Sequence, residues 1–166
     1  MEELIDKELI ESLKSQIIDK IYEIKNIHTK LDNLYNEYNN NKTIALGAID
    51  ELKDFRSKYK EEKEELAITF KGNAGEKRQA SMEVFLTALN KRINHAENDI
   101  IPDINKTISV LETKKEYYLK KQIEISKQLE SYEITKPNAS ELQTLLDTAK
   151  QIVTNGLAEI KEYDFE

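Results

Sequence analysis

Cysteine and tryptophan are absent from this chain of 166 residues, which also has only two prolines and four glycines. Without cysteine the chain forms no disulfide and uses no thiol chemistry, and this absence is compatible with a reducing or an oxidising compartment. Few helix-breaking residues, combined with many Glu, Lys, Leu, Ile and Asn residues, predict an all-α protein.

Long hydrophobic runs are also missing. No window approaches the ~18 consecutive apolar residues of a membrane span. The opening residues, MEELIDKE, have neither the basic nor the apolar region of a secretory signal. The net charge of −7 opposes binding to phosphate backbones and to anionic lipids. We therefore expect no nucleic-acid binding, no membrane insertion, and a location that is cytoplasmic or reached by export without a classical signal peptide.

Apolar residues recur every seven positions along two stretches that flank a break near Lys71. The first series runs through Ile10, Ile17, Ile24, Leu31, Tyr38, Ala45, Leu52, Tyr59 and Leu66. The second runs through Ile104, Leu111, Tyr118, Ile125 and Tyr132. Since Ile10 and Tyr132 lie equally far from Lys71, the pattern predicts a long, coiled-coil-like antiparallel two-helix hairpin over residues 1–135, with its turn at residues 70–75.

Two features could interrupt these helices. The heptad of the first helix, residues 3–67, passes Asn39, Asn40 and Asn41 without a change of phase, so we expect that helix to continue through them. In the second helix, residues 73–133, Pro102 removes an amide donor and should produce a kink. The apolar phase changes near this proline, because the later series does not include Met82, Phe85, Leu89, Ile93 and Ile100.

The turn should depend on Gly72 and Asn73. Glycine adopts the positive φ that ends a helix, and Asn73 with Glu76 three residues later has the pattern of a capping box. Phe70 is expected to pack in this turn.

Residues 136–139 read as a linker, and residues 140–166 as a short C-terminal helix with a frayed tail. Ser140 and Gln143 suggest a second capping box at the start of that helix. Gly156 should stop or weaken it. Its apolar positions are Leu142, Leu145, Leu146, Ala149, Ile152 and Val153.

Three residues beside the first seam, Ile21, Tyr35 and Ile49, widen the apolar stripe beyond what one partner helix covers. The C-terminal helix could reach Ile21 but not Ile49. We therefore predict that these residues bind another helical chain, either a different protein or a second copy.

Catalytic and metal-binding patterns are missing. His28 and His95 lie on opposite arms without further ligands at metal-binding spacing. Adjacent carboxylates such as Glu61 and Glu62 are typical of a solvated helix face, and there is no phosphate-binding glycine loop. The sequence therefore predicts a non-enzymatic protein without a cofactor or metal.

The tripeptide Phe70-Lys71-Gly72 in the turn of a helical hairpin resembles the aromatic-x-Gly motif of the WXG superfamily, whose members are helical proteins of type VII secretion systems. Phenylalanine replaces the usual tryptophan here. The following residues 73–85 are similar to the larger branch of the superfamily, which contains the LXG toxin N-terminal domains and the YwqH-like proteins. The C-terminal Tyr-x-x-x-Asp/Glu export signal of the family is missing, since no tyrosine has an acidic residue four positions later.

The resemblance implies a non-catalytic partner or targeting factor that binds the helical N-terminal domain of an LXG toxin and supports its solubility and export. A second small helical protein could complete the assembly and supply the missing signal. The alternative is a self-associating structural coiled coil, such as a phage or cytoskeletal rod.

Overall fold

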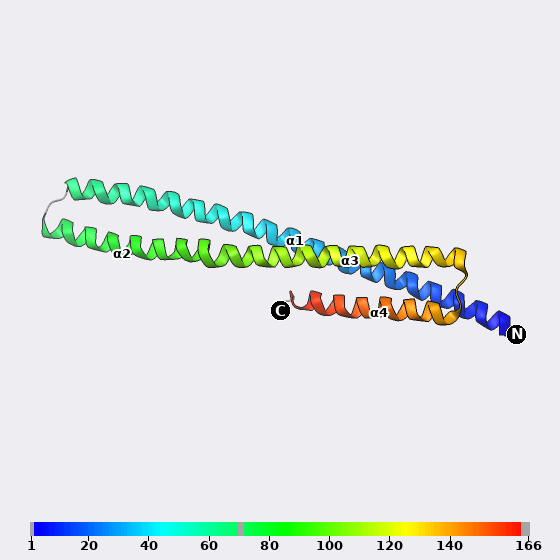
Figure 1. The fold of residues 1–166 in the computed structure, drawn as a ribbon. Coiled ribbons are helices and arrows are strands. Elements are labelled where there is room, and N and C mark those ends of the chain that lie inside the picture. The colour runs from blue at the N-terminus through cyan, green and yellow to red at the C-terminus, as the bar shows by residue number, and fades with distance from the viewer. Residues whose placement is uncertain (1, 70–71, 164–166) are drawn as a thin grey trace. The chain divides into compact units, whose positions relative to one another are not determined.

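The computed structural model describes residues 2–69 and 72–163, which form four α-helices and one π-helical turn and contain no β-strand (Figure 1). The elements are α1 (Glu2–Thr69), α2 (Asn73–His95), η1 (Ala96–Ile100), α3 (Ile101–Thr135) and α4 (Ala139–Lys161). The all-α prediction is confirmed. α1 is continuous through the asparagine triplet, as its unbroken heptad predicts.

Contacts divide the chain into two compact units. Unit 1 comprises Met1–Asn36 and Ser109–Glu166, and unit 2 comprises Glu37–Ile108. The C-terminal helix is part of unit 1, because its apolar face packs on α1 and α3.

Unit 1 is a three-helix bundle. α1 and α3 are antiparallel, since Lys14 pairs with Glu133 and Asp32 pairs with Lys115. Residues at helical spacing on all three helices point into one core. The buried hydrophobic residues are Leu13, Ile17, Ile24, Ile27 and Leu31 on α1, Leu111, Tyr118 and Ile125 on α3, and Leu142, Leu145, Leu146, Ala149, Ile152 and Val153 on α4.

Gly156 lies inside α4, so the prediction that it ends the helix is wrong. The reason is close packing between helices. A β-carbon at this position would lie 2.7 Å from Cδ1 of Ile27 and 3.0 Å from Cε1 of Tyr118. Glycine thus allows α4 to approach α1 and α3, and the helix continues to Lys161.

The connection before α4 is shorter than predicted, and its cap differs. Residues 136–138 are non-helical, and Lys136 has a φ of 46°. Asn138, rather than Ser140, is the N-cap, because its side chain accepts a hydrogen bond of 2.9 Å from the Glu141 amide. Asparagine there places the first turn two residues earlier than a cap at Ser140 would.

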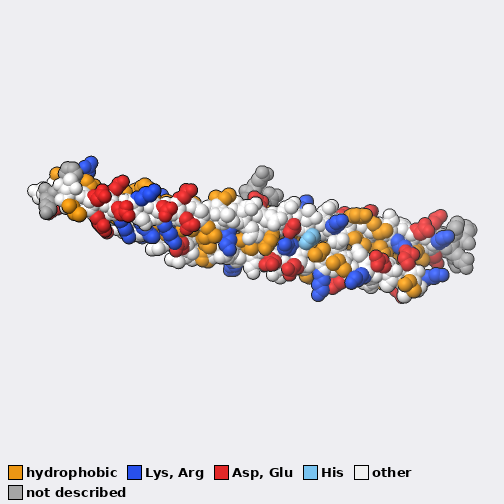
Figure 2. Space-filling view, turned by 90° about the horizontal axis from the view of Figure 1, so that it is seen from above, with side chains coloured by type: hydrophobic (Ala, Val, Ile, Leu, Met, Phe, Trp, Pro, Cys, Tyr) orange, Lys and Arg blue, Asp and Glu red, His pale blue; other side chains and the backbone are white. Residues whose placement is uncertain are grey.

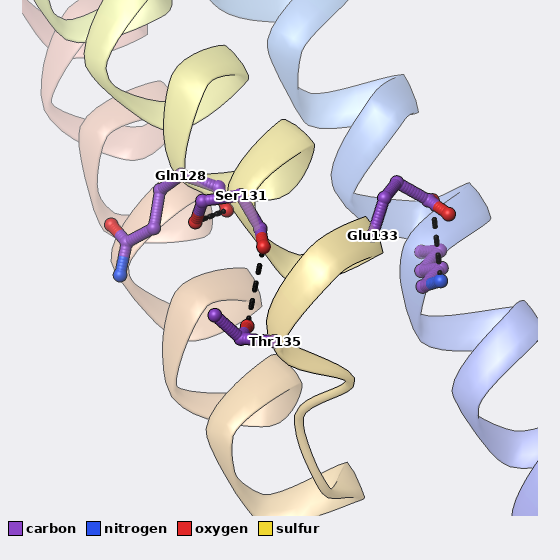
Figure 3. Close-up of polar contacts among 5 residues, drawn as sticks. Gln128, Ser131, Glu133 and Thr135 are labelled. Carbon is purple, nitrogen blue, oxygen red and sulfur yellow. Dashed lines mark hydrogen bonds and ion pairs between the residues drawn. The ribbon is translucent and has the colours of Figure 1, made fainter.

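The C-terminal end of α3 is held by side chains of two kinds (Figure 3). The hydroxyls of Ser131 and Thr135 donate to the carbonyls of Gln128 and Ser131, at 2.7 and 3.2 Å. Glu133 points the other way and receives a 3.3 Å bond from Lys14 Nζ on α1. The last turn is thereby fixed to its own helix and to its neighbour.

Unit 2 is an antiparallel pair made by residues 37–69 of α1 with α2, η1 and residues 101–108 of α3. Pairing runs in opposite directions along the two helices, since Lys63 contacts Glu83 and Lys53 contacts Glu97. The core is small. Its buried hydrophobic residues are Ile49, Met82, Leu86, Leu89 and Ile93.

The interruption predicted near Pro102 takes the form of the π-helix η1. The Ile101 amide donates to the Ala96 carbonyl, five residues back. Proline lacks the amide that a regular helix requires at its position, and a π turn holds one residue more than an α turn. The heptad of Met82 and Leu89, which would reach Asp103, accordingly resumes one residue late, at Ile104.

Candidate partner-binding surfaces

The predicted interface on α1 is only partly open in the structure. Ile49 is buried, with 5% of its surface exposed, against Leu89 and Ile93. The prediction that Ile49 remains for another chain is therefore wrong. α2 covers it because the helix pair of unit 2 is centred on this side of α1.

Tyr35 and Ile21 are both half-buried. The Nζ atom of Lys115 lies 4.0 Å from the ring centroid of Tyr35, a cation–π contact, and also donates to Asp32 at 3.1 Å. Tyr35 is therefore partly covered by Lys115 of α3, whereas the role predicted for Ile21 stays a prediction.

The predicted turn residues are described only in part. Phe70 lies outside the described residues, as does Lys71. Gly72 has a φ of 123° and a ψ of −178°, a conformation that favours glycine. It is the N-cap of α2 and accepts a 2.9 Å bond from the Glu76 amide. Asn73 is the first residue of α2, and no side chain caps this end, so the predicted capping box at Asn73 is not formed.

An aromatic cluster lies along one edge of unit 2 and is formed by Phe55, Tyr59 and Phe85. Ring centroids are 5.9 Å apart for Phe55 and Tyr59, 6.1 Å for Phe55 and Phe85, and 4.9 Å for Tyr59 and Phe85. Such distances are typical of favourable aromatic pairs. Nevertheless, Phe55 and Phe85 keep 48% and 45% of their surface exposed.

The other edge of the same helix pair is polar. Arg56 donates to Asn90 at 2.9 Å, and the Lys53–Glu97 and Lys63–Glu83 ion pairs bridge the helices on either side of it. The polar partners on α2 and η1, Glu83, Asn90 and Glu97, are spaced by seven residues and therefore form one row. Unit 2 thus has a closed polar edge and an open aromatic edge.

Unit 1 also exposes apolar side chains. Ile18 and Tyr22 follow each other by one turn on α1, and Leu119 and Ile123 do so on α3. Leu119 and Ile123 lie in a shallow depression of about 360 Å³ bordered by Lys and Glu side chains. Figure 2, seen from above relative to Figure 1, shows hydrophobic side chains between charged ones on this face of the molecule.

The two histidines and Tyr118 form polar contacts with neighbouring groups of the chain. The ring Nδ1 of His28 lies 2.8 Å from the Lys115 carbonyl, to which it donates, and His95 pairs with Asp99 at 2.7 Å. Tyr118 is buried and donates to Glu159 at 2.6 Å. Burial and this hydrogen bond raise the Tyr118 pKa above its ordinary value. Within residues 2–69 and 72–163, no three His, Asp or Glu side chains are grouped as metal ligands would be.

The aromatic cluster could have been anticipated from the sequence. Phe55 and Phe85 lie at nearly equal distances before and after the predicted turn, so antiparallel pairing brings them to the same level. What the heptad pattern does not reveal is the exposed edge, which depends on the rotation of each helix about its axis.

Comparisons with known proteins give no match: no family model matches the chain, and it matches no curated protein and no solved structure. Among the helices described, none is long and apolar enough to span a membrane.

Proposed function

We propose that this protein is a non-catalytic binding partner for a helix of another protein, and that the aromatic edge of unit 2 receives that helix. The observation that carries the proposal is the exposed cluster of Phe55, Tyr59 and Phe85. In unit 1, α4 covers the pair formed by α1 and α3. The described residues of unit 2 include no helix in the equivalent role.

The energetics favour a helical occupant. A groove between two antiparallel helices accepts the side chains of a third helix, and aromatic residues are enriched among those that dominate binding energies. About half of each phenylalanine ring is already covered, so completing its burial would contribute roughly 1 kcal/mol per ring. The ion-paired edge has no such apolar surface to bury. We therefore expect the helix to bind along the aromatic edge and not along the polar one.

We further propose that the occupant belongs to the helical N-terminal domain of an LXG toxin, within a type VII secretion system. Support for this part comes from the resemblance of residues 70–85 to the turn of that superfamily. Pairing would remove apolar stripes of both proteins from water, keep the toxin soluble and complete its recognition surface for export.

The test is co-expression with the helical N-terminal domain of an LXG toxin, comparing wild type with a Phe55→Asp and Phe85→Asp double variant. The matched control is a double variant with Ile68→Asp and Val84→Asp, two well-exposed positions of unit 2 outside the cluster. We expect the toxin domain to co-purify with wild type and with the control, and to be lost with the cluster variant. Circular dichroism checks that each variant stays helical.

Equal co-purification with all three proteins would refute the aromatic edge as the interface. If the chain alone forms dimers or larger assemblies that the cluster variant abolishes, and no toxin domain binds, the structural coiled coil is the correct function. Light scattering of the purified chain separates these outcomes.

A further inference from the structure

A second groove, in unit 1, differs in charge from the rest of the chain. It lies between α1 and α4 and has a volume of about 550 Å³. Its apolar lining comes from Ile27 and Val153, which are buried, and from Leu157, which is 50% exposed. This groove is separate from the aromatic edge of unit 2, and the inference drawn from it does not depend on the proposed function.

Lysines stand on both walls of the groove. Lys20 and Lys30 come from α1, and Lys150 comes from α4. Glu23 is the one acidic residue of the lining and forms a 2.8 Å ion pair with Lys20. The groove is therefore locally basic on a chain whose net charge is −7.

Two of these lysines form no ion pair within the described residues. Across the part of the chain that the structure describes, neither Lys30 nor Lys150 has an ion-pair partner, although the same chain pairs Lys14, Lys53, Lys63 and Lys115 between helices. Lys161 follows Leu157 by one turn on the same face of α4 and adds a further cation at that end. Unpaired lysines beside an apolar floor match a ligand that is apolar in the middle and anionic at its edges.

The length of the groove indicates what that ligand is. Its α1 wall extends from Lys20 to Lys30, about 15 Å at ~1.5 Å per residue. This distance corresponds to roughly three turns of a docked helix, whose apolar side chains would contact mainly Leu157, together with the small exposed parts of Ile27 and Val153.

We infer that the α1/α4 groove is a docking site for an acidic amphipathic helix of another protein. Its apolar stripe lies on the floor formed by Ile27, Val153 and Leu157. Its flanking carboxylates pair with Lys30 on one wall and Lys150 on the other. The lysines of the two walls favour acidic helices and disfavour basic ones, so the site selects its partner by charge.

The probes are two synthetic fluorescein-labelled peptides of equal length with the same leucine stripe, one flanked by glutamates and the other by lysines. Binding to the full chain is measured by fluorescence anisotropy at low and at raised salt. We expect the glutamate peptide to bind at least tenfold more tightly than the lysine peptide, with the difference shrinking as salt screens the charges.

Two double variants separate the groove from general electrostatics. Lys30→Glu with Lys150→Glu should weaken the glutamate peptide at least tenfold. Lys91→Glu with Lys106→Glu, at exposed positions of unit 2, changes the net charge equally but lies outside the groove, and should alter binding less than threefold. Leu157→Ser should weaken both peptides, because it removes part of the floor.

Equal binding of the two peptides, no binding of either, or equal losses in the two double variants would overturn the inference. Dodecanoate below its micellar concentration is the last probe. If dodecanoate binds in a manner that depends on Lys30 and Lys150 while the glutamate peptide does not bind, the groove takes an anionic amphiphile, and the docking of a helix is refuted.

Discussion

The two units differ in how the apolar stripes of their antiparallel helix pairs are covered. Each begins with two antiparallel helices whose apolar stripes cannot be fully covered by one neighbour. In unit 1, α4 supplies a third side, and Tyr118 and Leu111 are almost completely buried. In unit 2, the pair stands without such a helix among its described residues, and Phe55 and Phe85 stay half-exposed. The comparison shows that the third helix, rather than the heptad pattern, decides whether a seam becomes a closed core.

The largest expected effect comes from removing the anchor of α4. Leu146 is 1% exposed in the core of unit 1, so Leu146→Ala should lower the free energy of unfolding by about 2–5 kcal/mol. Hydrogen exchange should accelerate in α4 and in residues 109–135, and much less in residues 73–95. Ile134→Ala, at a position 85% exposed, is the control and should change stability by less than about 0.5 kcal/mol. Equal acceleration in both units would contradict their separation.

Two glycines inside helices provide a matched pair for the second prediction. Gly156→Leu should destabilise by about 1–3 kcal/mol, because the new side chain meets Ile27 and Tyr118. Gly47 in α1 has no atom within 4 Å of the position of a β-carbon, so Gly47→Ala should stabilise by up to about 1 kcal/mol through helix propensity. Chemical denaturation measures both. A stabilising Gly156→Leu would show that the contact between α4 and its neighbours is looser than described.

The third prediction concerns the hydrogen bond that joins α3 to α4. Tyr118→Phe removes the donor to Glu159 and should cost about 0.5–1.5 kcal/mol at neutral pH. Tyr22→Phe, at a position 60% exposed, should leave stability unchanged.

Alkaline pH sharpens this test. The folded state holds the Tyr118 proton more tightly than the unfolded chain, because burial and the bond to Glu159 raise its pKa. The contribution of Tyr118 to stability should therefore be constant below the ordinary tyrosine pKa near about 10 and decrease as the pH rises above it. The Tyr118→Phe variant should lose less stability over that range. An identical alkaline loss in wild type and variant would contradict this account.

The smallest effect is expected on the polar edge of unit 2. The hydrogen bond and charge of Lys63 hold the pKa of the Glu83 carboxyl below its ordinary value. Its contribution is therefore present above the ordinary carboxylate pKa and is lost as the pH falls through the lower, folded-state pKa. Glu83→Gln should flatten the acid-unfolding curve slightly, whereas Glu51→Gln, at an exposed position of the same unit, should not. Both glutamates are in solvent, so salt should remove the difference.

Much of the helical framework follows from the heptads. A stripe that keeps its phase through Asn39, Asn40 and Asn41 predicts the continuity of α1 correctly, because tertiary packing outweighs the low helix propensity of asparagine. The one-residue delay of the second seam at Ile104 is also visible in the sequence. Its cause, the π turn before Pro102, is apparent only when the backbone hydrogen bonds are seen.

The candidate binding surface was less predictable. Ile49 looks free in a heptad diagram, yet helix rotation places it against Leu89 and Ile93. Gly156 looks like a helix stop, yet its role depends on Ile27 and Tyr118, which are remote in sequence. Such features arise from distances between helices, which the composition and spacing of a single helix do not determine.

The missing side chain at Gly156 has a consequence for the alignment of α4 along α1 and α3. Sliding the helix by one turn would bring Ile152 or Ile160 beneath Ile27 and Tyr118, where even a single β-carbon meets atoms at 2.7–3.0 Å. Displaced alignments are thus opposed by steric overlap rather than by the loss of a polar contact. The alignment of α4 along α1 and α3 is therefore set by the one helix position that carries no side chain.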